Sequence, residues 1–214
     1  MMIPARKRRR SSWVGRIQGF VGPDHEYRTS VAASAVFAFL YGYLEYYYIL
    51  QSRPGLPFRY AYTPIFLGFY WYHIFPMLPI FGLIGFLPLL DDILFKFKPR
   101  QVEKLRTGIL GLVNLWLAVW FEDMFWFTFR LVDPLTGDPL GGKWIQVVGV
   151  GGLPDWTARW GYFDFGGNAL PYWYVISALL LAVAYYVVFF RPQLLERIRA
   201  YFVGGYERRS QGKA

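Results

Sequence analysis

The chain has 214 residues, of which 55% are hydrophobic and 21% aromatic, and its formal net charge is +9. This apolar content exceeds that of ordinary soluble domains, and the apolar residues occur in long runs that are typical of membrane-spanning helices. The chain contains no cysteine, which excludes disulfide bonds, thiolate metal sites, iron–sulfur clusters and thiol nucleophiles within it.

The first thirty residues are strongly basic and include the run Arg6–Arg10. The segment SWVGRIQGFV that follows, at 12–21, repeats its apolar residues at helical spacing with an arginine opposite, which predicts a short amphipathic helix in the membrane interface. We therefore predict that residues 1–30 form a basic cytoplasmic arm that contacts anionic lipid headgroups.

Four apolar runs have about the 20 residues that are needed to cross a hydrocarbon core of ~30 Å. They occupy residues 31–50, 64–90, 108–129 and 172–190. The second run contains Pro76, Pro79 and Pro88, so we expect it to be kinked or locally unwound. The predicted fold is an all-α integral membrane protein, in which residues 1–214 form a single domain built as a four-transmembrane-helix bundle.

The longest connection covers residues 131–170 and is rich in Gly, Pro, Asp and Trp. A connection of this length is uncommon unless it is functional or separately folded. We therefore predict a lid, with a helical turn near Asp155. Residues 191–214 form a basic tail, and the spacing of Leu194, Leu195, Ile198 and Phe202 predicts a second interfacial amphipathic helix there.

Lysine and arginine are unevenly divided among the segments outside the predicted spans. The N-terminal arm, the connection after the second span and the C-terminal tail hold seven, five and six of the 23 basic residues, whereas the two other connections share the remaining five. By the positive-inside rule, this alternation predicts a multi-pass protein of the cell membrane with both termini cytoplasmic and residues 131–170 extracytoplasmic. It also makes nucleic acid an unexpected partner.

Four ionisable residues lie within the predicted spans: Glu45, His73, Glu122 and Asp123. A helical rise of 1.5 Å per residue places them roughly 8 to 13 Å from the outer ends of their spans, whereas Asn114 lies in the inner half. Such residues cost several kcal/mol in lipid unless they face one another, an ion or a cavity, so we predict that they form a polar cluster, to which we also assign Asn114. Because adjacent helix positions point about 100° apart, we expect Asp123 to face a different neighbour from Glu122, or the lid.

The chemistry of this cluster is open to four interpretations. Glu45, His73 and Glu122 would offer one divalent metal, such as Mn, Fe or Zn, an oxygen-rich site with a single imidazole. The same groups could carry protons, act as an acid–base pair, or only hydrogen-bond across helices and stabilise the bundle. Haem is not expected because the two histidines lie far apart along the chain. Retinal is not expected because no predicted span carries a lysine.

The tryptophans and tyrosines are most simply interpreted as belts at the two membrane interfaces. The leading functional interpretation is a small accessory subunit or stand-alone module whose buried cluster handles protons or a cation. It would sit in the bilayer alone, with other membrane subunits or as a homo-oligomer. The alternative is a membrane-embedded enzyme that acts on a lipid-soluble substrate with a carboxylate–histidine site.

Overall fold

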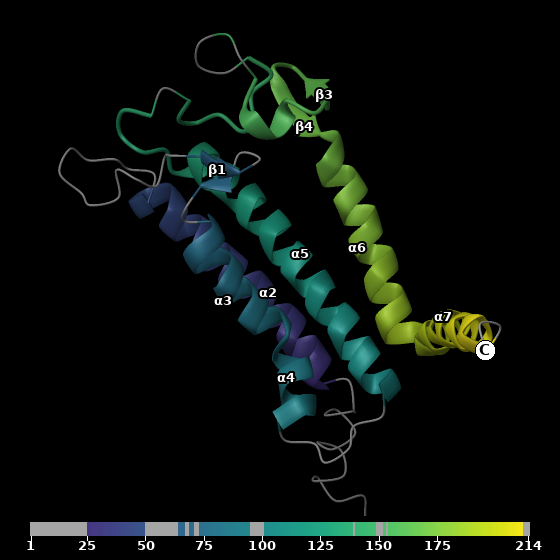
Figure 1. Ribbon diagram of the computed structural model, residues 1–214. Coiled ribbons are helices and arrows are strands. Elements are labelled where there is room, and N and C mark those ends of the chain that lie inside the picture. Colours follow the sequence, from purple (N-terminus) through teal and green to yellow (C-terminus); the bar gives the residue numbers. More distant parts are fainter. Residues whose placement is uncertain are drawn as a thin grey trace, which may run out of the picture.

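The computed structural model describes residues 25–49, 64–66, 69–70, 73–94, 101–138, 140–148, 152 and 154–211. Within these residues the chain is mostly helical. Helix α5 (Gln101–Val132) is the central element, because α2 (His25–Leu44) and α3 (Leu78–Gly85) pack against it, and α6 (Tyr172–Phe190) packs against it from the other direction (Figure 1). The mostly helical class that the sequence predicts is confirmed.

The structure changes the limits of the first and third predicted spans and confirms those of the fourth. Helix α2 begins at His25, six residues before the expected start, and continues into the wider π-helical segment η1 (Glu45–Ile49). Helix α5 has 32 residues and extends beyond the predicted 108–129 at both ends. Helix α6 occupies 172–190, as the unbroken apolar run predicts.

The second predicted span is wrong in its first part. The strands β1 (Pro64–Phe66) and β2 (Phe69–Tyr70) pair antiparallel, and the helical path starts only with the π-helical segment η3 (His73–Met77). It continues through α3 and, after a turn at Phe86, through α4 (Leu87–Leu94). His73 therefore lies at the start of this path, not nine residues inside it.

The prolines explain why this path is broken where it is. Proline has no N–H to donate and its ring crowds the preceding turn, so it is best tolerated in the first turn of a helix. Pro76 lies inside η3, Pro79 in the first turn of α3, and Pro88 is the second residue of α4. The predicted kinks and local unwinding are confirmed.

Among the described residues, two helices are long and apolar enough to cross a membrane, namely the part of α5 from Lys104 to Val132, and α6. A core helix of a soluble protein also passes this test, but such a helix is mostly buried. Here only 44% of the apolar window of α5 and 22% of that of α6 are buried. Large apolar side chains are instead exposed along α6, including Ile176, Leu179 and Val183.

Residues 131–171 fold over one end of the bundle; we call this segment the cap. It contains the 3₁₀ turn η5 (Trp156–Ala158) and the antiparallel hairpin of β3 (Tyr162–Phe165) and β4 (Asn168–Pro171). The turn near Asp155 is thus confirmed, whereas the hairpin was not predicted. Gly166 and Gly167 join the strands with φ of 64° and 89°, the positive values that a two-residue hairpin turn requires.

The opposite end of the bundle carries α7 (Pro192–Gln211), which turns away from α6 (Figure 1). This helix confirms the one expected in the basic tail. Leu195 of its apolar stripe is buried, whereas Leu194 and Ile198 are exposed. The amphipathic helix expected at 12–21 falls outside the described residues.

Candidate functional site

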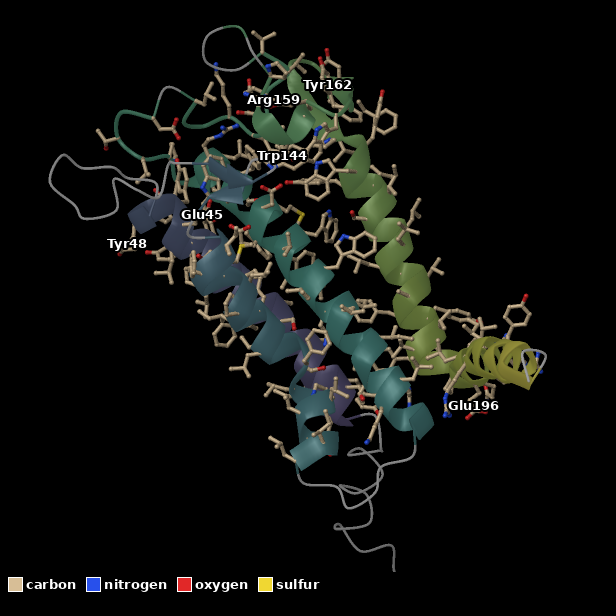
Figure 2. All side chains as sticks on the ribbon, in the orientation of Figure 1. Glu45, Tyr48, Trp144, Arg159, Tyr162 and Glu196 are labelled. Carbon is tan, nitrogen blue, oxygen red and sulfur yellow. The ribbon has the colours of Figure 1, made fainter. Side chains whose placement is uncertain are left out.

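The site is positioned by a close crossing of α2 and α5 at Gly42. A Cβ atom added to Gly42 would lie 2.9 Å from the carbonyl oxygen of Glu122, closer than real Cβ contacts allow. Because glycine has no side chain, the two backbones touch here, as small residues permit in membrane helix pairs. The crossing brings Glu45, which starts the π-helical turn after α2, next to Glu122 of α5 (Figure 2 marks Glu45).

Glu45 and Glu122 form a pair of buried carboxyl groups. They are only 5% and 4% exposed, and the two carboxyl groups lie close enough to interact directly. An ionised carboxylate can only accept hydrogen bonds, so a bond between two carboxyl groups requires a proton on one of them. The pair is therefore a candidate site for one proton between α2 and α5.

The surroundings of this pair are largely apolar. Tyr41 lies near both carboxyl groups and belongs to an apolar cluster with Met77, Phe81 and Ala118. Two ionised carboxylates in such a place would repel each other and lose their hydration, which makes the shared proton the favourable state.

Asp123 faces a different neighbour from Glu122, as the 100° step along a helix predicts. Its Oδ2 accepts hydrogen bonds from the Tyr174 hydroxyl of α6 at 2.5 Å and from the Thr157 hydroxyl of the cap at 3.4 Å. The Trp173 indole donates to the Thr157 hydroxyl at 3.0 Å. Asp123 thus connects α5 to α6 and to the cap, and its expected contact with the 131–170 loop is confirmed.

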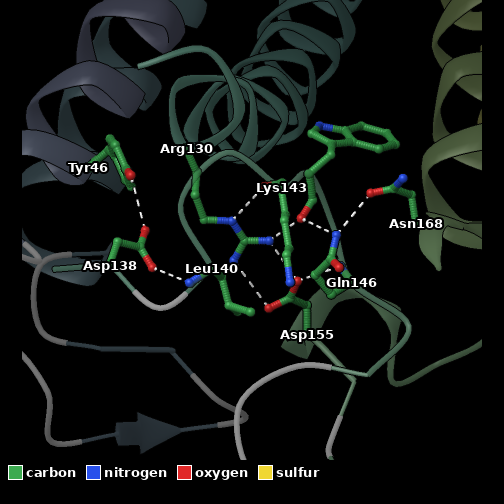
Figure 3. A network of polar contacts seen from close by, with 9 residues as sticks. Tyr46, Arg130, Asp138, Leu140, Lys143, Gln146, Asp155 and Asn168 are labelled. Atoms are coloured by element: carbon green, nitrogen blue, oxygen red, sulfur yellow. Dashed lines mark hydrogen bonds and ion pairs between the residues drawn. The ribbon is translucent and has the colours of Figure 1, made fainter. Parts of the chain in front are cut away.

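A second set of polar contacts holds the cap on the last turn of α5 (Figure 3). Arg130 is 2% exposed and forms a two-pronged ion pair with Asp155, with distances of 2.7 Å and 3.3 Å. It also donates to the carbonyl oxygens of Lys143, at 3.0 Å, and Trp144. The backbone N–H of Gln146 donates to Asp155, so the Asp155 carboxylate binds both Arg130 and the cap backbone at Gln146.

Two tyrosines of η1, the π-helical segment that continues α2, bind the cap. The Tyr46 hydroxyl donates to Asp138 at 3.0 Å and accepts from the N–H of Leu135, and the Tyr47 hydroxyl donates to the Asp133 carboxylate at 2.7 Å. Sequence reasoning assigned these tyrosines to an interfacial belt and gave Arg130 no role. The only available signal for Arg130 was its place directly after a predicted span, and no spacing rule connects it to Asp155.

Asn114 is not part of the carboxyl cluster. It lies eight residues before Glu122, about 12 Å along the helix axis. Its amide donates to the Ser30 hydroxyl at 3.0 Å and to the Gly85 carbonyl at 3.3 Å, and its oxygen accepts from the Tyr185 hydroxyl at 2.9 Å. It therefore joins α2, α3 and α6 to α5, which is a structural role.

We expect Asn114→Ala to lower the free energy of unfolding by about 2 kcal/mol. Hydrogen bonds between membrane helices contribute on average ~0.6 kcal/mol and at most ~1.7 kcal/mol each, and three are lost here. Unfolding in mixed micelles of increasing SDS fraction, followed by circular dichroism, measures the effect. Thr128→Ala is the control, because the Thr128 hydroxyl bonds only to its own helix, at the Met124 carbonyl, and its loss should cost a few tenths of a kcal/mol. Equal losses in the two variants would contradict the role of Asn114.

The proposed metal ligands are brought together only in part. Glu45 and Glu122 are in contact, but the imidazole of His73 lies outside the described side chains. Among the side chains that the structure describes, no group of three from His, Asp and Glu converges on a metal site. The divalent metal thus stays a prediction.

Comparison with known proteins gives no further guidance on the site. The chain matches no protein-family model, no curated protein and no solved structure.

Proposed function

We propose that the chain is a small multi-pass membrane protein that binds and exchanges a proton at the Glu45–Glu122 pair. A monovalent cation that replaces the proton would use the same carboxyl oxygens. In this proposal the spans are α2 with η1, the path from η3 to α4, α5 and α6. The module acts alone or as an accessory subunit of a membrane assembly.

The exposed apolar surface supports the membrane location. Apart from α5 and α6, helix α2 also exposes large apolar side chains, among them Val36, Phe37 and Leu40. A soluble protein rarely exposes apolar surface on this scale, whereas lipid tails cover it without cost. Helix α6 has 19 residues and is thus about 28 Å long, close to the ~30 Å of a hydrocarbon core.

The arrangement of the ends supports the proposed orientation. The start of α2, the end of α4, the start of α5 and the end of α6 lie at one end of the bundle, and the cap lies at the other (Figure 1). The described basic residues Lys104, Arg106, Arg191 and Arg197 belong to the first end. A cytoplasmic location for that end follows the positive-inside rule and makes the cap extracytoplasmic.

The close approach of two buried carboxyl groups is the observation that carries the proposal. A purely structural contact between helices needs no proton, and an amide would serve it equally well. A shared proton responds to pH on the side of the membrane from which it exchanges. The pair lies in the half of the bundle nearer the cap, since Tyr46, next to Glu45, contacts Asp138 of the cap directly.

We expect Glu45→Gln/Glu122→Gln to keep the fold, because amides still hydrogen-bond, but to abolish proton handling. Two measurements check this on purified protein. Infrared difference spectra between pH values should show a carboxylic acid band in the wild type that the double variant lacks. In liposomes, the wild type should dissipate an imposed pH gradient faster than protein-free vesicles, and the double variant should not.

Glu196→Gln is the matched control, since it makes the same chemical change at an exposed position on α7 (Figure 2). It should retain both the infrared band and the gradient dissipation. If the double variant also retained both, the pair would be a structural contact only and the proposal would be wrong. Elemental analysis of the same samples tests the metal alternative, because a metal that depends on both glutamates would move the enzyme interpretation forward.

A further inference from the structure

Strand β3 and the residues directly before it expose three large aromatic side chains. Trp160 is 71% exposed, Phe163 48% and Phe165 61%. None of these residues belongs to a helix, and none is among the side chains that pack against the buried core of Ala169 and Tyr174. Large apolar side chains that cluster on a surface mark a contact with a partner or a membrane.

The strand geometry places the two phenylalanines on one face. Side chains two residues apart on a strand point to the same side, so Phe163 and Phe165 share a face with their cross-strand partners Leu170 and Asn168. Asp164 points to the other side and accepts a hydrogen bond from the N–H of Gly167 in the turn. The hairpin thus has an apolar face at 163 and 165 and a polar position between them.

This apolar face is continuous with the surfaces of α6 and α5. Strand β4 ends at Pro171, directly before α6, and the ring of Phe163 lies 4.7 Å from that of Tyr172, the first residue of α6. Phe165 of this face also lines an open groove of about 430 Å³. Trp144 of the cap and Leu131 from the end of α5 line the same groove. The face therefore begins where the exposed apolar surfaces of the two helices end.

We propose that this face of the hairpin binds the bilayer surface, with Phe163, Phe165 and Trp160 at the boundary between headgroups and acyl chains. The inference rests on the membrane location proposed above. If α6 spans the hydrocarbon core, Tyr172 lies at its outer edge and Phe163 with it. Phe165 is two residues further along the strand, at most ~7 Å away, which is comparable to the thickness of the headgroup layer.

The composition of the face fits a lipid surface better than a protein partner. Tryptophan and tyrosine concentrate at this depth because their rings are amphipathic, and exposed Arg159, next to Trp160, suits lipid phosphate groups. The hairpin would fix the level of the cap relative to the bilayer. A docked protein is the alternative that the experiment below distinguishes.

The absence of cysteine from the chain makes the test direct. The three variants Phe163→Cys, Asp164→Cys and Phe165→Cys are each labelled with a nitroxide. The labelled proteins are then reconstituted into phosphatidylcholine/phosphatidylglycerol liposomes. Collision rates with oxygen, which concentrates in lipid, and with a water-soluble nickel complex are then compared by electron paramagnetic resonance. We expect the oxygen-to-nickel ratio to be several-fold higher at 163 and 165 than at 164.

A label at Leu180, an exposed position in the middle of α6, separates the two proposals. Lipid exposure at 180 together with water exposure at 163, 164 and 165 would overturn the hairpin inference and leave the membrane location intact. Water exposure at 180 would overturn the membrane location itself.

The unlabelled chain offers a second measurement, which does not depend on changes at the phenylalanines. Lipids brominated near the headgroup should quench the fluorescence of the wild type more than that of Trp160→Phe. The difference between the two proteins reports the fluorescence of Trp160. Lipids brominated deep in the acyl chain should quench this difference less than lipids brominated near the headgroup. Equal quenching of the two proteins by shallow bromines would count against the inference.

Discussion

Arg130→Ala is expected to lower the free energy of unfolding by about 3 to 5 kcal/mol, the usual loss when one partner of a buried ion pair is removed. The substitution leaves the Asp155 carboxylate without its cation and frees the carbonyl oxygens of Lys143 and Trp144. It also removes a guanidinium that lies 4.8 Å from the centre of the Phe127 ring. SDS titration followed by circular dichroism measures the loss.

Because Arg130 holds the cap, we also expect chymotrypsin to cleave the 131–171 segment faster in the variant than in the wild type. Arg130→Lys should recover only part of the stability, since an ammonium cannot form the two-pronged contact. Arg159→Ala removes an exposed arginine of the same segment and should change stability by less than about 0.5 kcal/mol. If Arg130→Ala and Arg159→Ala behaved alike, the ion pair would not hold the cap.

The second large effect concerns the crossing of α2 and α5, because Gly→Ala at the crossing and Gly→Ala in α3 should change the stability in opposite directions. Gly42→Ala places a Cβ atom 2.9 Å from the carbonyl oxygen of Glu122, which is backbone and cannot rotate away. The helices must separate, at a cost of about 1 to 3 kcal/mol for overpacking. Gly82→Ala in α3 meets nothing within 4 Å, so it should stabilise the protein by up to about 1 kcal/mol through helix propensity.

Separation of α2 and α5 should also weaken the contact between the two carboxyl groups. We therefore expect Gly42→Ala to alter the carboxylic acid band in the infrared spectrum, whereas Gly82→Ala should leave it unchanged. An unaltered band in a clearly destabilised Gly42→Ala protein would mean that the pair does not depend on this crossing.

The sequence predicts best those features that follow from a single helix. The limits of α6 follow from an apolar run that nothing interrupts, and the divergence of Glu122 and Asp123 follows from the helical step. An interruption of the helix near Pro76, Pro79 and Pro88 was predictable, because proline lacks the N–H that a helical turn requires. Their detail was not, since a π-helical turn at His73 or Glu45 reflects packing rather than local preference.

Contacts between distant segments are the part that sequence reasoning could not reach. Arg130 and Asp155 are separated by 25 positions, and Asp123 and Tyr174 by 51, so no periodicity relates them. The hairpin is a different case, because Gly166 and Gly167 between two short apolar stretches are a recognised turn signal. That signal was missed because the connection was interpreted as a lid whose predicted structure was a helical turn near Asp155.

The neighbours of the paired glutamates along the chain give the site a property that neither glutamate has alone. Glu45 is followed by Tyr46, and Glu122 is followed by Asp123, and both of these neighbours bind the cap. In the proposed function, the proton site and the cap contact are therefore one peptide bond apart on each helix. If proton binding and cap attachment are coupled, thermodynamic linkage makes this coupling reciprocal. Release of the cap would then change the free energy of proton binding by the same amount as proton binding changes the free energy of cap attachment. If the pair binds a proton as proposed, a ligand that pulls on residues 131–171 would act as an effector of protonation, and pH would act as an effector of that ligand.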